Sequence, residues 1–156
     1  MKKYLVLFCS LLMFIITFKT YAQNTMESSS AVPPSDLKLE GVWELVSFYN
    51  YGANGAVDTI KASKSYRQIK MYSKTKVMWS RFVESDSTDW FGYGTYSVAD
   101  NILTEALDYG SKSMNPIISE REEFEFNLIL KKDKFSQIER DQDGNPLIAE
   151  NYIRIE

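Results

Sequence analysis

From Gly41 to its C-terminus, the chain consists of short strand-forming runs separated by turn residues, and this pattern limits the fold more than any other feature. The eight runs are Val42 to Tyr51, Tyr66 to Tyr72, Lys76 to Glu84, Asp89 to Val98, Ile102 to Tyr109, Glu122 to Lys131, Lys134 to Asp141 and Leu147 to Ile155. The "NG" at residues 54–55 and the "DG" at residues 143–144 are strong hairpin signals. No segment has a helical period long enough to cover a sheet. The sequence therefore predicts an all-β antiparallel meander that either closes into a barrel or folds into a sandwich.

The direction of the side chains is clearest between residues 122 and 131. The apolar set on one face is Phe124, Phe126, Leu128 and Leu130, and the polar set on the other is Glu123, Glu125 and Asn127. Burying each apolar side chain contributes about 1.5–3 kcal/mol, which fixes the register of this strand. Between Lys76 and Glu84 apolar side chains occupy both faces instead. That pattern fits a thin barrel with a partly covered exterior, or a surface that meets a partner.

The first 22 residues have the organisation of an export signal. Lys2 and Lys3 precede an apolar run from Tyr4 to Phe18, and cleavage is expected between Ala22 and Gln23. The run is short for a membrane span, which needs about 20 apolar residues. We therefore expect a periplasmic or extracellular protein, with membrane attachment only if this segment is retained. Residues 23–36, rich in Ser and Pro, are expected to be a flexible leader before a single domain at 37–156.

The composition excludes several kinds of chemistry. The chain has no histidine, and its one cysteine, Cys9, lies inside the predicted signal. Histidine-based triads, cysteine nucleophiles and the usual zinc sites are therefore ruled out for the mature chain. Removing Lys2, Lys3 and Lys19 leaves 15 basic against 21 acidic residues, a net charge of −6, which disfavours binding to nucleic acid. We expect no enzymatic activity, no metal site and no cofactor.

Several stretches resemble the lipocalin-like domain family, in particular its small exported bacterial members. "LEGVWELVS" is similar to the G-x-W start of that family, preceded by a short helical turn that Ser35 or Asp36 would cap. The stretches "GYGTYSVADNILTEALDYGSKSM" and "AENYIRIE" are similar to later hairpins and to the final strand. The resemblance covers roughly residues 37–156. It implies a calycin-type, up-and-down antiparallel β-barrel of about eight strands.

The same resemblance assigns a structural role to one tryptophan. It implies that Trp43 packs across the closed end of the barrel against a basic side chain of the last strand, for which Arg154 is the candidate. A guanidinium over an indole contributes about 0.5–2 kcal/mol. This pair is expected to close the barrel and not to bind a ligand.

The stretch "DWFGYGTYSV" from Asp89 to Val98 contains two glycines on the same face as Trp90 and Tyr96. Either Gly92 and Gly94 leave room beside the aromatic rings for a ligand, or they allow the sheet to bend sharply where the barrel turns. The bend is the favoured interpretation, and the two can hold together.

A second candidate feature is a pair of ionisable side chains at nominally apolar positions. Arg81 shares a face with Trp79, and Glu105 alternates with leucines. A ligand with a polar head would meet Arg81, with its apolar body against Met71, Trp79, Trp90 and Tyr96. Alternatively, Arg81 and Glu105 form an ion pair with each other and no ligand is involved. The acidic group Glu84, Asp86 and Asp89 lies on a predicted hairpin tip and is interpreted as a solvated turn.

The sequence thus favours an exported lipocalin-like protein that binds a small apolar molecule inside its barrel. The competing interpretation is a filled barrel that binds a protein partner through exposed aromatic side chains. A cavity of about 300 Å³ or more would favour the first interpretation.

Overall fold

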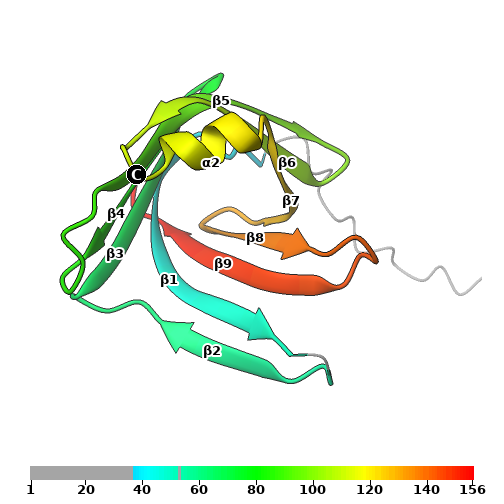
Figure 1. The fold of residues 1–156 in the computed structure, drawn as a ribbon. Coiled ribbons are helices and arrows are strands. Elements are labelled where there is room, and N and C mark those ends of the chain that lie inside the picture. Colours follow the sequence, from blue (N-terminus) through cyan, green and yellow to red (C-terminus); the bar gives the residue numbers. More distant parts are fainter. Residues whose placement is uncertain (1–36, 53) are drawn as a thin grey trace, which may run out of the picture. The chain divides into compact units, whose positions relative to one another are not determined.

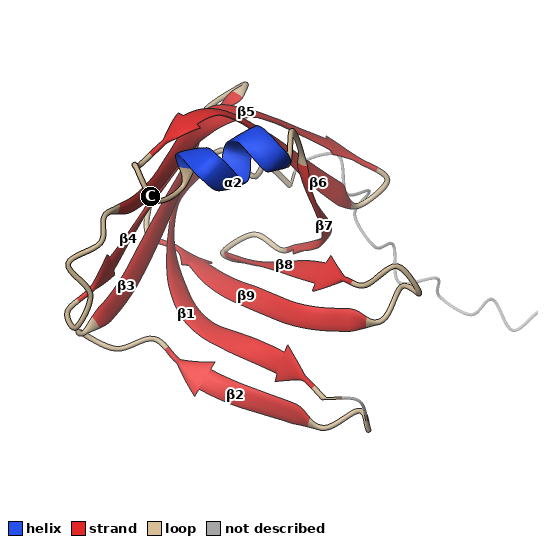
Figure 2. Ribbon diagram, viewed as in Figure 1, coloured by secondary structure: helices blue, strands red, loops and turns tan. Residues whose placement is uncertain are grey.

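The computed structural model describes residues 37–52 and 54–156, which form a single closed β-sheet and one short helix (Figure 1). The strands are β1 (Gly41–Tyr51), β2 (Val57–Lys61), β3 (Tyr66–Tyr72), β4 (Lys76–Val83), β5 (Trp90–Ala99), β6 (Ile102–Gly110), β7 (Phe124–Leu130), β8 (Lys134–Arg140) and β9 (Pro146–Arg154). The helix α2 (Asn115–Glu120) lies against β6 (Figure 2). The expected export signal at 1–22 and leader at 23–36 lie outside the described residues.

The sheet closes because the first and last long strands pair with each other. All neighbours are antiparallel, and β1 pairs with β9 from Trp43↔Arg154 to Asn50↔Ile148. On its other edge β1 pairs with β3 near its start and with β2 along its second half. The result is an eight-stranded up-and-down barrel with β2 as an additional strand, which decides between the barrel and the sandwich.

All eight strand-forming runs are strands, and their boundaries agree with the expectation to within two residues. The sequence prediction missed β2. All five of its residues are exposed, so the segment lacks the alternation of apolar and polar residues that identifies a strand with one buried face. It also missed α2, a six-residue helix. The helical turn expected before β1 is not found at residues 37–40, and residues 35–36 lie outside the described part. Within that described part, no helix has the length and apolarity needed to cross a membrane.

The two glycines of β5 leave room for atoms that approach the strand closely. A Cβ at Gly94 would lie 2.0 Å from the carbonyl oxygen of Ala106, at the point where the β5–β6 register shifts. A Cβ at Gly92 would lie 2.8 Å from the indole nitrogen of Trp79. Neither glycine opens space for a ligand, because backbone and a tryptophan already occupy that space. The irregular register at Gly94 agrees with the interpretation that this glycine allows the sheet to bend, whereas Gly92 makes room for the Trp79 indole.

The well-packed part of the core lies at the end of the barrel where β1 begins and β9 ends. Its fully buried members include Trp43, Leu45, Leu103, Phe135 and Tyr152. The Phe135 ring packs edge-on against Trp43 at 4.9 Å and is stacked on Tyr152 at 4.5 Å. A site inside the barrel would therefore lie in the opposite half, toward β2.

Candidate functional site

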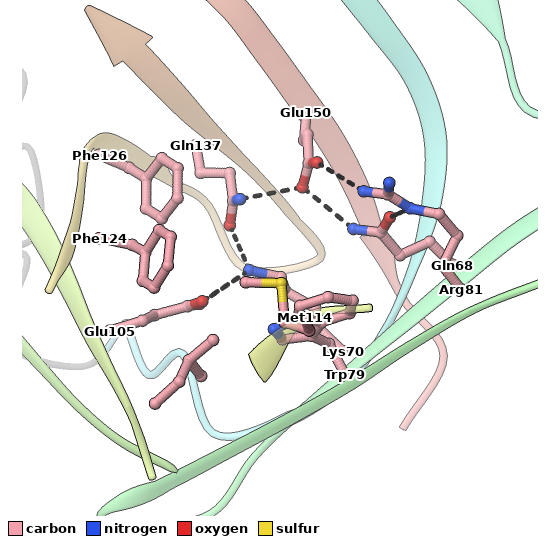
Figure 3. Close-up of a pocket in the computed structure, with 11 residues that line it drawn as sticks. Gln68, Lys70, Trp79, Arg81, Glu105, Met114, Phe124, Phe126, Gln137 and Glu150 are labelled. Carbon is pink, nitrogen blue, oxygen red and sulfur yellow. Dashed lines mark hydrogen bonds and ion pairs between the residues drawn. The ribbon is translucent and has the colours of Figure 1, made fainter. Parts of the chain in front are cut away.

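Two cavities that share four lining residues occupy the open half of the barrel, and Figure 3 shows the inner one. The inner cavity has a volume of about 90 Å³, and the outer one, at the mouth, about 270 Å³. Both are lined by Arg81, Phe126, Gln137 and Glu150. The outer cavity is otherwise largely apolar or aromatic, with Phe48, Ile60, Tyr66 and Ile148 in its wall. The arrangement is a mouth that narrows toward a polar layer, with the packed core beneath it.

The polar layer contains a buried ion pair. The Lys70 ammonium on β3 lies 2.8 and 3.1 Å from the two carboxylate oxygens of Glu105 on β6, and both side chains are 3% exposed. Lys70 also donates to the amide oxygen of Gln137 at 2.9 Å, and the Tyr72 hydroxyl donates to Glu105. Burial, together with the charge of Glu105, raises the pKa of Tyr72 well above its usual value. Tyr72 therefore remains a neutral donor, and the pair has the extra hydrogen bonds that a buried ion pair needs.

Glu150 on β9 accepts a second set of hydrogen bonds. Its Oε2 accepts from the amides of Gln137 at 2.9 Å and Gln68 at 3.1 Å, and from the hydroxyl of Tyr152. Burial, followed by the charge of Glu150, raises the pKa of Tyr152 well above its usual value. Gln137 bonds to both Lys70 and Glu150, so the two acidic centres belong to one continuous network.

Arg81 on β4 lies where the two cavities meet. Its Nε donates to the Gln68 amide oxygen at 2.7 Å, and its guanidinium lies 5.8 Å from the Tyr66 ring centroid and 6.0 Å from that of Trp79. Its Nη2 is 3.9 Å from Oε1 of Glu150, beyond hydrogen-bonding distance. Arg81 is thus held by packing and one hydrogen bond, while its outer nitrogens face the cavity.

The charges of this layer balance. Lys70 and Arg81 oppose Glu105 and Glu150, and across the described residues no buried side-chain nitrogen or oxygen lacks a hydrogen-bond partner. An ion pair between Arg81 and Glu105 was one of the interpretations from the sequence. The partners are different: Glu105 pairs with Lys70, and Arg81 faces Glu150. Lys70 occupies a buried position of β3 between the more exposed Ile69 and Met71, so its side chain points into the barrel and reaches Glu105.

Of the six residues expected to line the interior, three line the inner cavity and three do not. Trp79, Arg81 and Glu105 are in its wall. Trp90 is half-buried and donates to Asp86 at 3.3 Å, and Tyr96 donates to the carbonyl of Ser73 at 2.8 Å. Neither Trp90 nor Tyr96 contributes to the wall of either cavity.

The expected interior position of Met71 is corrected by the structure. Met71 is 42% exposed and pairs across the strands with Met78, which is 41% exposed. It alternates with the buried Lys70 and Tyr72, so strand parity directs its side chain to the outer face.

Trp43 and Arg154 lie together at the closed end. They are directly paired across β1 and β9, and the Arg154 guanidinium lies 4.0 Å from the centroid of the fully buried indole. Arg154 also donates to the carbonyls of Lys38 and Glu40. A Cβ at Gly41 would lie 2.2 Å from Arg154 Nη1, and Gly41 has a φ of +136°. The glycine two residues before Trp43 is thus required by both the backbone conformation and the approach of Arg154.

The acidic hairpin between β4 and β5 has the geometry of a solvent-exposed turn. Asp86 accepts from the backbone N–H of Thr88 at 2.9 Å, and the hydrogen bonds from Thr88 lower the pKa of Asp86. Over residues 37–52 and 54–156, no group of three or more acidic side chains is placed to hold a metal ion.

The sequence interpretation missed most of the polar layer. Gln68, Lys70, Gln137 and Glu150 line the inner cavity, together with Met114, the residue before α2. A signal for two of them was present in β3, where Gln68 and Lys70 alternate in phase with the aromatic residues Tyr66 and Tyr72. Polar residues that share a face with aromatic ones are candidates for inward-facing positions.

Comparison with solved structures identifies proteins of similar fold. An uncharacterized protein from Bacteroides eggerthii is similar with a TM-score of 0.50 and 16% sequence identity, over 75% of this chain and 99% of that chain. A lipocalin-like protein from Bacteroides uniformis has a TM-score of 0.48 and 14% identity, over 75% of this chain and 98% of that chain. No protein-family model and no curated protein matches the sequence. At these identities the likeness concerns the fold alone, which is an up-and-down antiparallel β-barrel.

Proposed function

We propose that the barrel binds a small, largely apolar molecule at its open end. The observation that carries this proposal is the pair of cavities that share Arg81 and Glu150, with apolar and aromatic side chains of the mouth beside these two charged groups. Mostly apolar walls with a few converging polar groups are the usual composition of a ligand pocket.

The cavity volumes limit the size of the ligand. Ligand pockets commonly measure about 300–1,000 Å³, and the mouth, at about 270 Å³, lies just below that range. The inner cavity, at about 90 Å³, is far too small for a drug-sized molecule. The ligand's apolar body therefore belongs in the mouth, and only its end reaches the polar layer.

The proposal can be tested with a neutral fluorescent probe. The full-length chain is titrated with N-phenyl-1-naphthylamine, and the variant Ile148→Trp fills the mouth, whose wall includes Ile148. We expect at least a tenfold weaker affinity for the probe in this variant, because the added ring takes the space of the ligand. The control is Ile129→Trp, at a position 51% exposed on β7 that lines neither cavity. Equal affinity in wild type and Ile148→Trp would contradict binding in the mouth.

A filled barrel that acts through a protein partner is the second candidate, and a different surface supports it. Met71, Met78, Tyr93 and Tyr109 are successive cross-strand neighbours on the outer face of β3 to β6. Three of them are more than 40% exposed. If the wild-type chain binds no probe, this outer row becomes the better candidate, and Met78→Glu is the variant to compare with wild type in partner binding.

We also propose that the mature protein is exported. The support is the sequence of residues 1–22, with its basic start and apolar run. Intact-mass measurement of the protein from fractionated cells tests this. In the exported fraction we expect a chain whose mass corresponds to a start at Gln23. A chain of full-length mass, found only in the membrane fraction, would support a retained anchor instead.

A further inference from the structure

We propose that the ligand's polar group is an uncharged carboxamide, held between the guanidinium of Arg81 and Oε1 of Glu150. This proposal rests on the proposed function, because it specifies the class of molecule that the mouth would bind. It concerns the junction of the two cavities, where Arg81 and Glu150 lie side by side (Figure 3).

Arg81 offers donors at this junction. A guanidinium has five N–H donors. Within the described residues, the hydrogen bond of Arg81 is made by Nε to Gln68. The Nη1 and Nη2 groups are left beside the aromatic rings of Tyr66 and Trp79, and the side chain is 29% exposed. A ligand oxygen arriving from the mouth would meet these N–H groups first.

Glu150 offers an acceptor next to those donors. All three hydrogen bonds that the described residues donate to Glu150 end on Oε2. The other oxygen, Oε1, faces Arg81, whose Nη2 lies 3.9 Å away. Because this separation exceeds a hydrogen bond, both atoms retain capacity for a partner. Glu150 is 17% exposed, so its free oxygen is accessible from the cavity without being fully hydrated.

The separation fits a group that carries an acceptor and a donor side by side. In a carboxamide the oxygen and nitrogen are bonded to one carbon at about 1.23 and 1.33 Å, so they lie roughly 2.3 Å apart. The oxygen can accept from Arg81 Nη2 while the N–H donates to Glu150 Oε1, in two slightly diverging hydrogen bonds. A carboxamide therefore bridges the 3.9 Å gap without moving either side chain.

Charged head groups fit less well because the layer is already neutral. A carboxylate on Arg81 would place its second oxygen against the like charge of Glu150. An alkylammonium on Glu150 would face both Arg81 and the nearby Lys70. Either ion would also lose hydration without an unmatched counter-charge to compensate for it. The uncharged amide avoids both costs.

Calorimetric titration of the full-length wild-type chain with octanamide, octanoate and octylamine at pH 7 tests the proposal. The three molecules share an eight-carbon chain and differ in the head group. We expect octanamide to bind at least tenfold more tightly than either charged analogue. Octanoate binding as tightly as octanamide, or more tightly, would overturn the proposal.

The variant Glu150→Gln identifies the residue that sets the preference. It removes the negative charge while keeping an amide oxygen and nitrogen at the same position. We expect octanoate to gain at least tenfold in affinity and octanamide to change by less than about fivefold. The matched control is Glu139→Gln, because Glu139 also lines the mouth but is paired with Arg121. It should leave the order of the three affinities unchanged, and circular dichroism checks the folding of both variants.

The outcomes separate this proposal from the proposed function. If N-phenyl-1-naphthylamine binds in the mouth but none of the eight-carbon molecules does, the head-group proposal fails and the binding proposal stands. If neither the probe nor the series binds, both fail. If octanamide is preferred by wild type and Glu150→Gln leaves octanoate unchanged, the assignment to Glu150 is overturned.

Discussion

The two ends of the barrel are built from the same alternating strands but are filled in different ways. At the closed end the inward positions hold Trp43, Leu103 and Phe135, none more than 1% exposed. At the open end the inward positions hold Lys70, Glu105 and Glu150, and two cavities remain. Close packing without polar atoms favours stability, whereas a layer of satisfied charges gives little net stability but fixes the directions of polar groups. If the open end binds a ligand as proposed, the residues that stabilise the fold and those that contact the ligand lie at different levels along the barrel axis.

The largest expected effect comes from unbalancing the charged layer. Lys70→Met leaves Glu105 buried without its counter-ion, which should lower the free energy of unfolding by about 3–5 kcal/mol. The double variant Lys70→Met/Glu105→Leu removes both charges and should recover most of that loss. Urea denaturation followed by circular dichroism measures both. A loss below about 1 kcal/mol in the single variant would mean that water reaches this layer, which would break the contrast between the two ends.

Packing should matter more at the closed end than at the mouth. Leu103 is fully buried, and Leu103→Ala should cost about 3 kcal/mol, because a cavity is left among close-packed neighbours. Ile148 is 41% exposed in the wall of the mouth, and Ile148→Ala should cost less than about 1 kcal/mol. Thermal and urea unfolding of the two variants give the comparison. Equal losses would show that the open end contributes to the stability of the core as much as the closed end does.

The strand pattern could be predicted from the sequence because each long strand has one buried face. The alternation of Phe124, Phe126 and Leu128 was sufficient to place β7, and the barrel closure followed from the number of strands and the resemblance. The strand β2 could not be predicted in the same way, since it pairs only with the second half of β1 and all its residues are exposed.

The candidate site was harder to predict because its members come from distant strands. Trp79 and Arg81 were found from their unusual pattern within one strand, but the partner of Glu105 lies 35 residues earlier in the sequence. A buried lysine looks like an exposed one until the parity of its strand is known. Met71 shows the converse: its apolar side chain, next to Lys70, predicts an inward position, whereas the parity of β3 directs it outward.

Cation–π contacts provide a further comparison of the two ends. Arg154→Lys removes the planar group that covers Trp43 and weakens the hydrogen bonds to the carbonyls of Lys38 and Glu40. It should cost about 1–2 kcal/mol. At the open end, the Arg121 guanidinium lies 4.8 Å from the Phe124 ring, and the Arg121 side chain is 45% exposed. Arg121→Lys should therefore cost less than about 0.5 kcal/mol. Urea unfolding of both variants tests whether burial of the aromatic partner sets the difference.

The smallest expected effect is a pH dependence that comes from two buried tyrosines, Tyr72 and Tyr152, whose hydroxyls donate to Glu105 and Glu150. Burial and the nearby carboxylates raise the pKa values of Tyr72 and Tyr152 well above 10.0 in the folded protein. The unfolded chain releases these protons from about pH 10, while the folded chain retains them, so stability is full below pH 10 and falls as the pH rises further. Between pH 9 and pH 10.5 each tyrosine should account for a loss of about 0.8 kcal/mol in the free energy of unfolding, whatever its exact folded pKa.

The variant Tyr72→Phe isolates one of these contributions. It removes the hydrogen bond to Glu105 and lowers stability at every pH, so the slope against pH is the quantity to compare and not the absolute value. Its stability should fall about 0.8 kcal/mol less than that of wild type between pH 9 and pH 10.5. Tyr152→Phe should reduce the slope by a similar amount, because the second tyrosine is buried to the same degree. Parallel curves for wild type and Tyr72→Phe would mean that this phenol titrates alike in the folded and unfolded chain, and that the layer beneath the cavities is open to solvent.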